Sequence, residues 1–136
     1  MKLLLISIVL SLPVVAVAED VGTIVATLND PQAECRYLAE KNFVQRTAQR
    51  EYDEAMRKWS QATHAMEQAP KYSQERQNLF QAVEVTQDHA KQTGASARLA
   101  AGEVRTIESV IRARRGSLAQ CQKEIEKLPP ISRASE

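Results

Sequence analysis

Apolar residues recur along the C-terminal half of this 136-residue chain in steps of alternately four and three positions. Only Thr86, Thr93 and Arg114 interrupt this set, which we call the second seam. A 3.5-residue period kept over such a length is typical of a long helix that packs along a partner helix. The positions of the second seam are Leu79, Val83, Thr86, Ala90, Thr93, Ala97, Ala100, Val104, Ile107, Ile111, Arg114, Leu118, Cys121, Ile125 and Leu128.

A shorter set with the same spacing, the first seam, precedes it and consists of Ala48, Tyr52, Ala55, Trp59, Ala62, Met66 and Ala69. Upstream the period decays, because Lys41 and Gln45 occupy the corresponding positions, whereas the apolar residues there lie off the seam, namely Tyr37, Leu38, Phe43 and Val44. Asp30 followed by Pro31 predicts a helix start, with the aspartate as N-cap and the proline in the first turn. Pro70 lies between the seams and predicts a turn.

These signals predict an all-α fold, a long antiparallel helical hairpin that resembles a coiled coil. We expect one helix over 31–69, a turn over 70–74 and a second helix over 74–128, which the two prolines after it end. Gly94 weakens the second helix and is compatible with a bend there. Residues 129–136 are expected to form a flexible tail.

Residues 19–30 are expected to be an extended N-terminal segment. Within it, 23–28 is a short run that favours β structure. We expect this run to pack along the open end of the hairpin near 112–121. The alternative is that it adds as a strand to the sheet edge of another protein.

The first eighteen residues have the pattern of a secretory signal peptide. Met1 and Lys2 give a positive start, an apolar run covers 3–10, and small residues end the segment at Ala18. We expect cleavage after Ala18 and a periplasmic or secreted mature protein, with a retained N-terminal anchor as the alternative. No later stretch is apolar enough to cross a membrane.

Cys35 and Cys121 are the two cysteines of the chain. For an exported protein we expect them to form an intrachain disulfide, with an interchain bond and free thiols as alternatives. A hairpin that turns near residue 71 places Cys35 opposite residue 107, which leaves Cys121 roughly 21 Å away. A loop that runs to about residue 78, an extended segment over 31–40, or a bond between two chains would solve this problem.

Composition excludes several classes of function. Lys and Arg number 18 against 17 Asp and Glu, so the charge gives no reason to expect a nucleic acid partner. His64 and His89 lack metal-ligand partners at a recognised spacing, and no phosphate-binding loop or nucleophile motif is present. We therefore expect no catalytic residue, no metal, no cofactor and no enzymatic activity.

Some residues are candidates for contact with a partner. Trp59 lies on the first seam and is expected in the core, with an exposed hot spot as the alternative. Tyr37 and Phe43 lie off the seam, either packed against the preceding segment or exposed as a patch. The basic cluster Arg112, Arg114 and Arg115 either extends into solvent or docks an acidic partner or anionic lipid head groups.

We expect a non-enzymatic exported protein that acts through protein–protein contacts. An accessory subunit of an envelope, secretion or conjugation assembly fits this description. The alternative is a periplasmic chaperone or inhibitor that grips clients between helices. Because a seam rich in alanine buries little area, association with a third helix or with a second copy would stabilise the hairpin.

Overall fold

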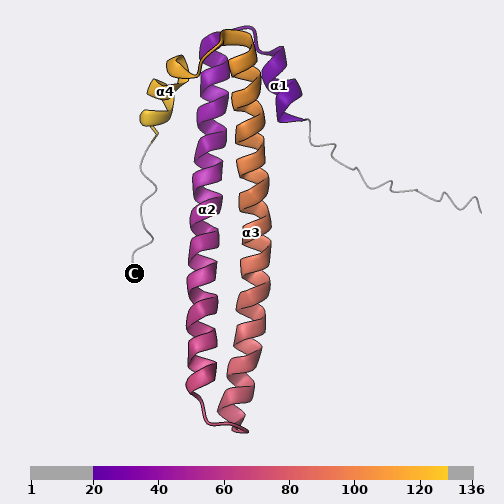
Figure 1. Ribbon diagram of the computed structural model, residues 1–136, viewed down its shortest axis with the longest axis vertical. Coiled ribbons are helices and arrows are strands. Elements are labelled where there is room, and N and C mark those ends of the chain that lie inside the picture. The colour runs from indigo at the N-terminus through magenta and orange to yellow at the C-terminus, as the bar shows by residue number, and fades with distance from the viewer. Residues whose placement is uncertain (1–19, 129–136) are drawn as a thin grey trace, which may run out of the picture.

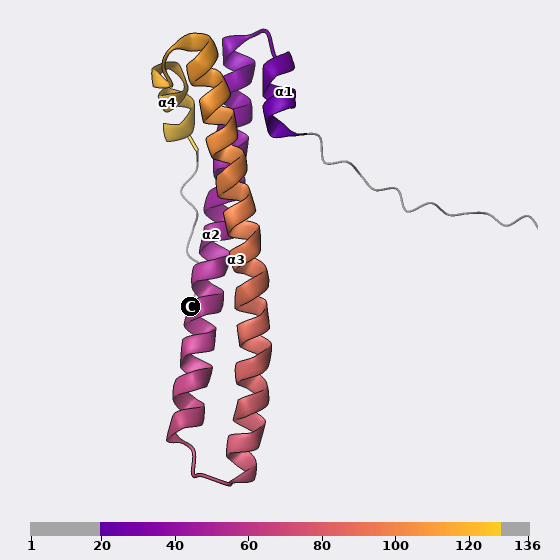
Figure 2. The same ribbon diagram turned by 45° about the vertical axis from the view of Figure 1, so that its right-hand side comes forward.

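The computed structural model describes residues 20–128, which form four helices (Figure 1). Helices α2 (Pro31–Gln68) and α3 (Gln74–Arg115) pair as a long antiparallel hairpin. The short helices α1 (Val21–Thr27) and α4 (Ala119–Glu126) lie at the end opposite the connecting turn, on opposite sides of the hairpin (Figures 1 and 2). The predicted all-α hairpin is confirmed. The predicted signal peptide, 1–18, and the predicted tail, 129–136, lie outside the described residues.

Capping side chains define where the long helices begin. The Asp30 carboxylate accepts a hydrogen bond of 3.0 Å from the backbone N–H of Gln32, and Pro31 occupies the first helical position. The hydroxyl of Ser73 accepts a hydrogen bond of 3.1 Å from the backbone N–H of Arg76 at the start of α3. Tyr72, in the turn between the helices, has a φ of 63° and is 98% exposed.

The two seams form the interface between α2 and α3. On α3 every seam position from Leu79 to Ile111 is buried or half-buried, and on α2 the same holds from Ala48 to Ala69. α3 continues through Gly94 without a break. A Cβ atom at position 94 would lie 2.9 Å from Cε2 of Tyr52, so this glycine allows the tyrosine ring to approach the α3 backbone.

The two glycines inside α3 are expected to respond differently to alanine. Gly102→Ala should raise the free energy of unfolding by about 0.5–1 kcal/mol, because alanine favours a helix and no atom lies within 4 Å of the new Cβ. Gly94→Ala should leave the protein at least about 1 kcal/mol less stable than Gly102→Ala, because the Tyr52 ring must move. Urea unfolding followed by circular dichroism measures both. Equal stabilisation of the two variants would contradict the close packing at Gly94.

The second long helix ends earlier than the sequence predicted. We expected helix over 74–128, but α3 stops at Arg115 and Gly116 caps it with a φ of 75°. The backbone N–H of Gly116 donates a 2.8 Å hydrogen bond to the carbonyl of Arg112. Glycine adopts this left-handed conformation without steric cost, and basic residues in the last turn favour a helix C-terminus. The chain then reverses, and α4 begins at Ala119.

The N-terminal segment is helical where we expected it to be extended. Within 19–30, Val21–Thr27 forms α1, and the Asp20 side chain accepts a 3.1 Å hydrogen bond from the N–H of Gly22. Val21 and Val25, one turn apart, are buried together with Ile107 of α3. Burial of this pair outweighs the β preference of the run, so the segment packs within its own chain, but as a helix.

Helices α1 and α4 create a core at one end of the molecule only. We call residues 21–41 and 103–126 the head, and residues 42–102, which form the remainder of the hairpin with its turn, the arm. The buried apolar residues of the head come from all four helices and include Val25, Leu38, Ile107 and Ile111. In the arm the buried apolar residues are all alanines, namely Ala55, Ala69, Ala90, Ala97 and Ala100. The head therefore holds most of the buried apolar volume.

Neither long helix contains an apolar stretch of the kind that crosses a bilayer, and the same is true of the other helices within residues 20–128.

Candidate functional site

A disulfide bond closes the head. Cys35 of α2 and Cys121 of α4 are joined within one chain, with their Cα atoms 4.8 Å apart. The structure closes the distance between the two cysteines by none of the three arrangements that the sequence suggested. The turn stays near residue 71, residues 31–40 are helical, and the bond lies within one chain. Instead α3 ends at Arg115 and the chain folds back after Gly116, which brings Cys121 beside Cys35.

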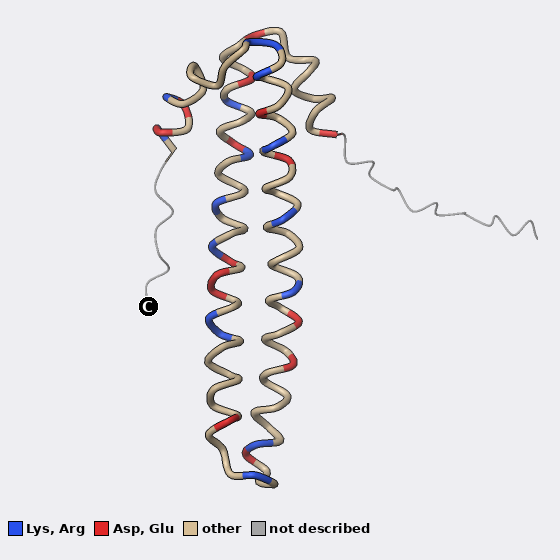
Figure 3. The backbone as a smooth tube through the Cα atoms, in the orientation of Figure 1, with Lys and Arg blue, Asp and Glu red and all other residues tan. Residues whose placement is uncertain are grey.

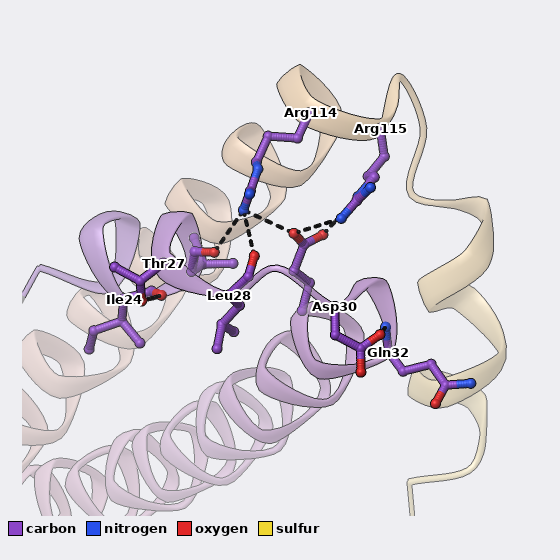
Figure 4. A network of polar contacts seen from close by, with 9 residues as sticks. Ile24, Thr27, Leu28, Asp30, Gln32, Arg114 and Arg115 are labelled. Carbon is purple, nitrogen blue, oxygen red and sulfur yellow. Dashed lines mark hydrogen bonds and ion pairs between the residues drawn. The ribbon is translucent and has the colours of Figure 1, made fainter.

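A buried carboxylate lies beside the disulfide on α2. The Glu34 side chain is 1% exposed and forms ion pairs with two arginines of α3. Nη1 of Arg114 lies 2.9 Å from Oε1 of Glu34, and Nε of Arg115 lies 3.3 Å from Oε2 (Figure 4). Bidentate contact with Arg115 is completed by Nη2, which donates to Oε1 at 3.3 Å.

Arg114 also connects α1 to this cluster. Its Nη1 donates to the backbone carbonyls of Val25, at 3.1 Å, and Leu28, at 2.9 Å (Figure 4). Both carbonyls lie at the C-terminal end of α1, where a cation is favourable, and that of Val25 also accepts a 3.2 Å hydrogen bond from the backbone N–H of Leu28. One charged cluster thus fixes α1, the start of α2 and the end of α3 against one another. In the described part of the chain no buried side-chain nitrogen or oxygen lacks a partner.

The role of Glu34 was missed by the sequence analysis, although a signal for it exists. Stepping upstream from Ala48 with the same alternation reaches Gln45, Lys41, Leu38 and Glu34. Leu38 is fully buried, and Lys41 forms an ion pair of 3.2 Å with Glu103. The interpretation that the period decays upstream and that Leu38 lies off the seam is therefore wrong. Lys41 and Glu34 continue the seam and pair with charged residues of α3.

The predicted contact residues do not form one surface. Tyr37 is half-buried against the head core, with Nζ of Lys41 at 5.8 Å from its ring centroid. Arg112 is exposed and pairs with Glu108 at 3.7 Å. Arg114 and Arg115 have a structural role in the head that the sequence did not reveal. Contact of these four residues with a partner stays a prediction.

The other two predicted contact residues belong to the arm. Phe43 is 40% exposed, next to Val44, which is 50% exposed. Trp59 is half-buried and lines two adjoining hollows of about 230 and 430 Å³, and Met56 lines both of them as well. The first hollow lies between the helices, and we call it the arm groove; its lining includes Tyr52, Met56 and Trp59 of α2 and Lys91, Gly94 and Arg98 of α3.

A further hollow of about 730 Å³ lies at the end of the arm, beside the turn. Its lining includes Met66 of α2, Tyr72 of the turn and Phe80 of α3, and Phe80 is 52% exposed. Apolar side chains are thus accessible along the arm and at its end. Accessible aromatic and methionine side chains are typical of surfaces that bind other proteins.

Charges of both signs are mixed along the arm (Figure 3). Glu54 and Lys58 form an ion pair of 3.6 Å on α2. Lys91 and Arg98, on the edge of the arm groove, form no ion pair within residues 20–128. Within the same residues no cluster of three or more His, Cys, Asp or Glu side chains could hold a metal ion.

Comparison with protein-family models, with curated proteins and with solved structures finds no match to this chain. The candidate site therefore follows from geometry alone. A head fixed by a disulfide and an ionic cluster carries an arm whose apolar side chains are accessible to a partner.

Proposed function

We propose that this chain is a non-enzymatic exported protein of the periplasm whose arm makes protein–protein contacts. An accessory subunit of an envelope, secretion or conjugation assembly is the role that fits this description. The supporting observation is that the head contains the stabilising contacts of the molecule, whereas the arm contains few of them. The head contains the core, the disulfide and the ionic cluster, whereas the arm extends roughly 40 Å beyond the head and its buried apolar residues are all alanines.

The energetics of the arm favour a binding role. Alanine contacts bury little apolar area, so each additional turn of the arm contributes little to folding. Larger side chains such as Trp59 and Phe80 stay partly accessible. A long, weakly stabilised pair of helices with accessible aromatic rings is the arrangement expected where a partner supplies the remaining burial.

Two observations support export. The sequence of residues 1–18 has the order of a secretory signal peptide. The disulfide between Cys35 and Cys121 joins the chain's two cysteines, and such bonds persist in oxidising compartments outside the cytoplasm.

A photo-crosslinking scan in the cells that make the protein tests the proposal. A photoreactive amino acid is placed at Phe43 or Phe80 of the arm and, as a matched exposed control, at Gln122 of α4. We expect an adduct of one defined mass from at least one arm position and none from Gln122. Absence of adducts from both arm positions, with the protein exported and folded, would contradict a binding function of the arm.

The alternative role, a chaperone or inhibitor that grips clients between helices, is favoured by the hollow at the end of the arm. Because α2 and α3 contact each other along their seams, a cavity for a client would have to form between several copies. This role predicts a stable oligomer in light scattering and adducts of many masses from Phe80. A monomer with a single adduct would exclude it.

A further inference from the structure

We propose that the arm groove docks one amphipathic helix of the protein partner, with the apolar edge of that helix on Tyr52, Met56 and Trp59 and with acidic side chains beside Lys91 and Arg98. This inference rests on the proposed function, since it assumes that the arm binds a protein. Beyond that function, it names the surface of this chain that binds and the chemistry of the partner segment that docks there.

Helix α4 shows how a third helix fits on this side of the hairpin. α4 packs against α2 through Cys121, which is bonded to Cys35. Met56 follows Cys35 by three heptads, so in a coiled-coil pair both residues lie on the same face of α2. α4 covers this face only in the head (Figures 1 and 2). A docked helix in the arm groove would continue the layer that α4 begins.

The floor of the arm groove suits an apolar helix edge. Gly94 provides no side chain on α3, and the Tyr52 ring lies against that position. Ala90, which is 4% exposed, lines the same hollow, so the α3 side is shallow while Met56 and Trp59 extend from α2. The rings of Tyr52 and Trp59 and the thioether of Met56, beside this shallow α3 surface, favour insertion of an apolar side chain of the partner, such as leucine.

The charge on the edge of the groove selects the partner. Lys91 and Arg98 are seven residues apart and therefore share a face of α3. Neither forms an ion pair within residues 20–128. Two cations that have no carboxylate partner in the described part of the chain favour a helix with carboxylates at matching spacing.

The chain contains a single tryptophan, and it lines the arm groove, so Trp59 fluorescence reports occupancy directly. The probe is a synthetic 21-residue helical peptide with leucine at seam spacing and glutamate at the flanking positions. Its counterpart carries lysine in place of every glutamate. We expect the acidic peptide to shift Trp59 emission to shorter wavelength in a saturable manner, and the basic peptide to produce no shift.

Charge reversal then tests the edge. The double variant Lys91→Glu with Arg98→Glu should bind the acidic peptide at least tenfold more weakly and should gain binding of the basic peptide. Arg57→Glu, an exposed position of α2 outside the arm groove, is the matched control and should bind like the wild-type protein. Circular dichroism of each variant establishes that the helices are retained.

Several results would overturn the inference. These are no shift with either peptide, equal binding of both peptides, or unchanged binding by the double variant. A dimer of the free protein in light scattering that Met56→Lys dissociates would also overturn it, because the groove would then be filled by a second copy. Crosslinks in cells from Phe43 or Phe80, together with failure of the acidic peptide, would leave the proposed function standing and remove only the arm groove.

Discussion

Replacing Cys35 and Cys121 together by serine should lower the free energy of unfolding by about 4–5 kcal/mol. The bond closes a loop between residues that are 86 positions apart, and the entropy that such a cross-link removes from the unfolded chain is of this size. α4 should detach in the variant, because it is only eight residues long and Cys121 is its buried residue. Urea unfolding followed by circular dichroism measures the loss.

The control for this experiment is reduction. Adding dithiothreitol should destabilise the wild-type protein by a similar amount and should leave the double serine variant unchanged. Size measurements with and without dithiothreitol should give a monomer in both conditions, since the bond lies within one chain. A loss below about 1 kcal/mol would contradict the role of the disulfide in closing the head.

Glu34→Gln should lower the free energy of unfolding by about 2–3 kcal/mol. Removing one member of a buried ion pair commonly costs about 3–5 kcal/mol. Here we expect a smaller loss of stability, because the side chains of Arg114 and Arg115 are 31% and 33% exposed. Water can therefore solvate both guanidinium groups once the carboxylate is gone. Urea unfolding of the oxidised protein measures the effect.

The matched control is Glu103→Gln, which removes a carboxylate of similar kind whose partner is Lys41. Both side chains of that pair are 29% exposed, so the expected loss is only about 0–1 kcal/mol. Equal losses for Glu34→Gln and Glu103→Gln would show that the buried cluster has no special role.

Periodicity predicted the pairing of the two long helices, since the spacing of residues such as Ala55 and Ala97 reflects a direct physical requirement for burial between helices. The same signal misplaced the end of α3. The apolar period runs on through Leu118, Cys121 and Ile125, since α4 also buries one face. The chain reverses before α4, so these positions do not belong to α3. Gly116 after a basic turn was the local stop signal, and it was outweighed by the period.

Other features required the tertiary structure. The helical state of Val21–Thr27 depends on the burial of Val21 and Val25 against α3, which local propensity opposes. The burial of Glu34 depends on two arginines about eighty positions away. Of the arm groove, the sequence singled out Trp59 but not Lys91 or Arg98, because their common edge exists only once α2 and α3 are in register.

The central claim is that the arm stands away from the head as a single pair of helices. Small-angle X-ray scattering of the oxidised protein, purified without residues 1–18, tests this directly. The 42 residues of α3 span roughly 63 Å, so an extended monomer should have a radius of gyration of about 20 Å. A radius near 13 Å, the value of a compact domain of this size, or the mass of a stable oligomer, would contradict the account.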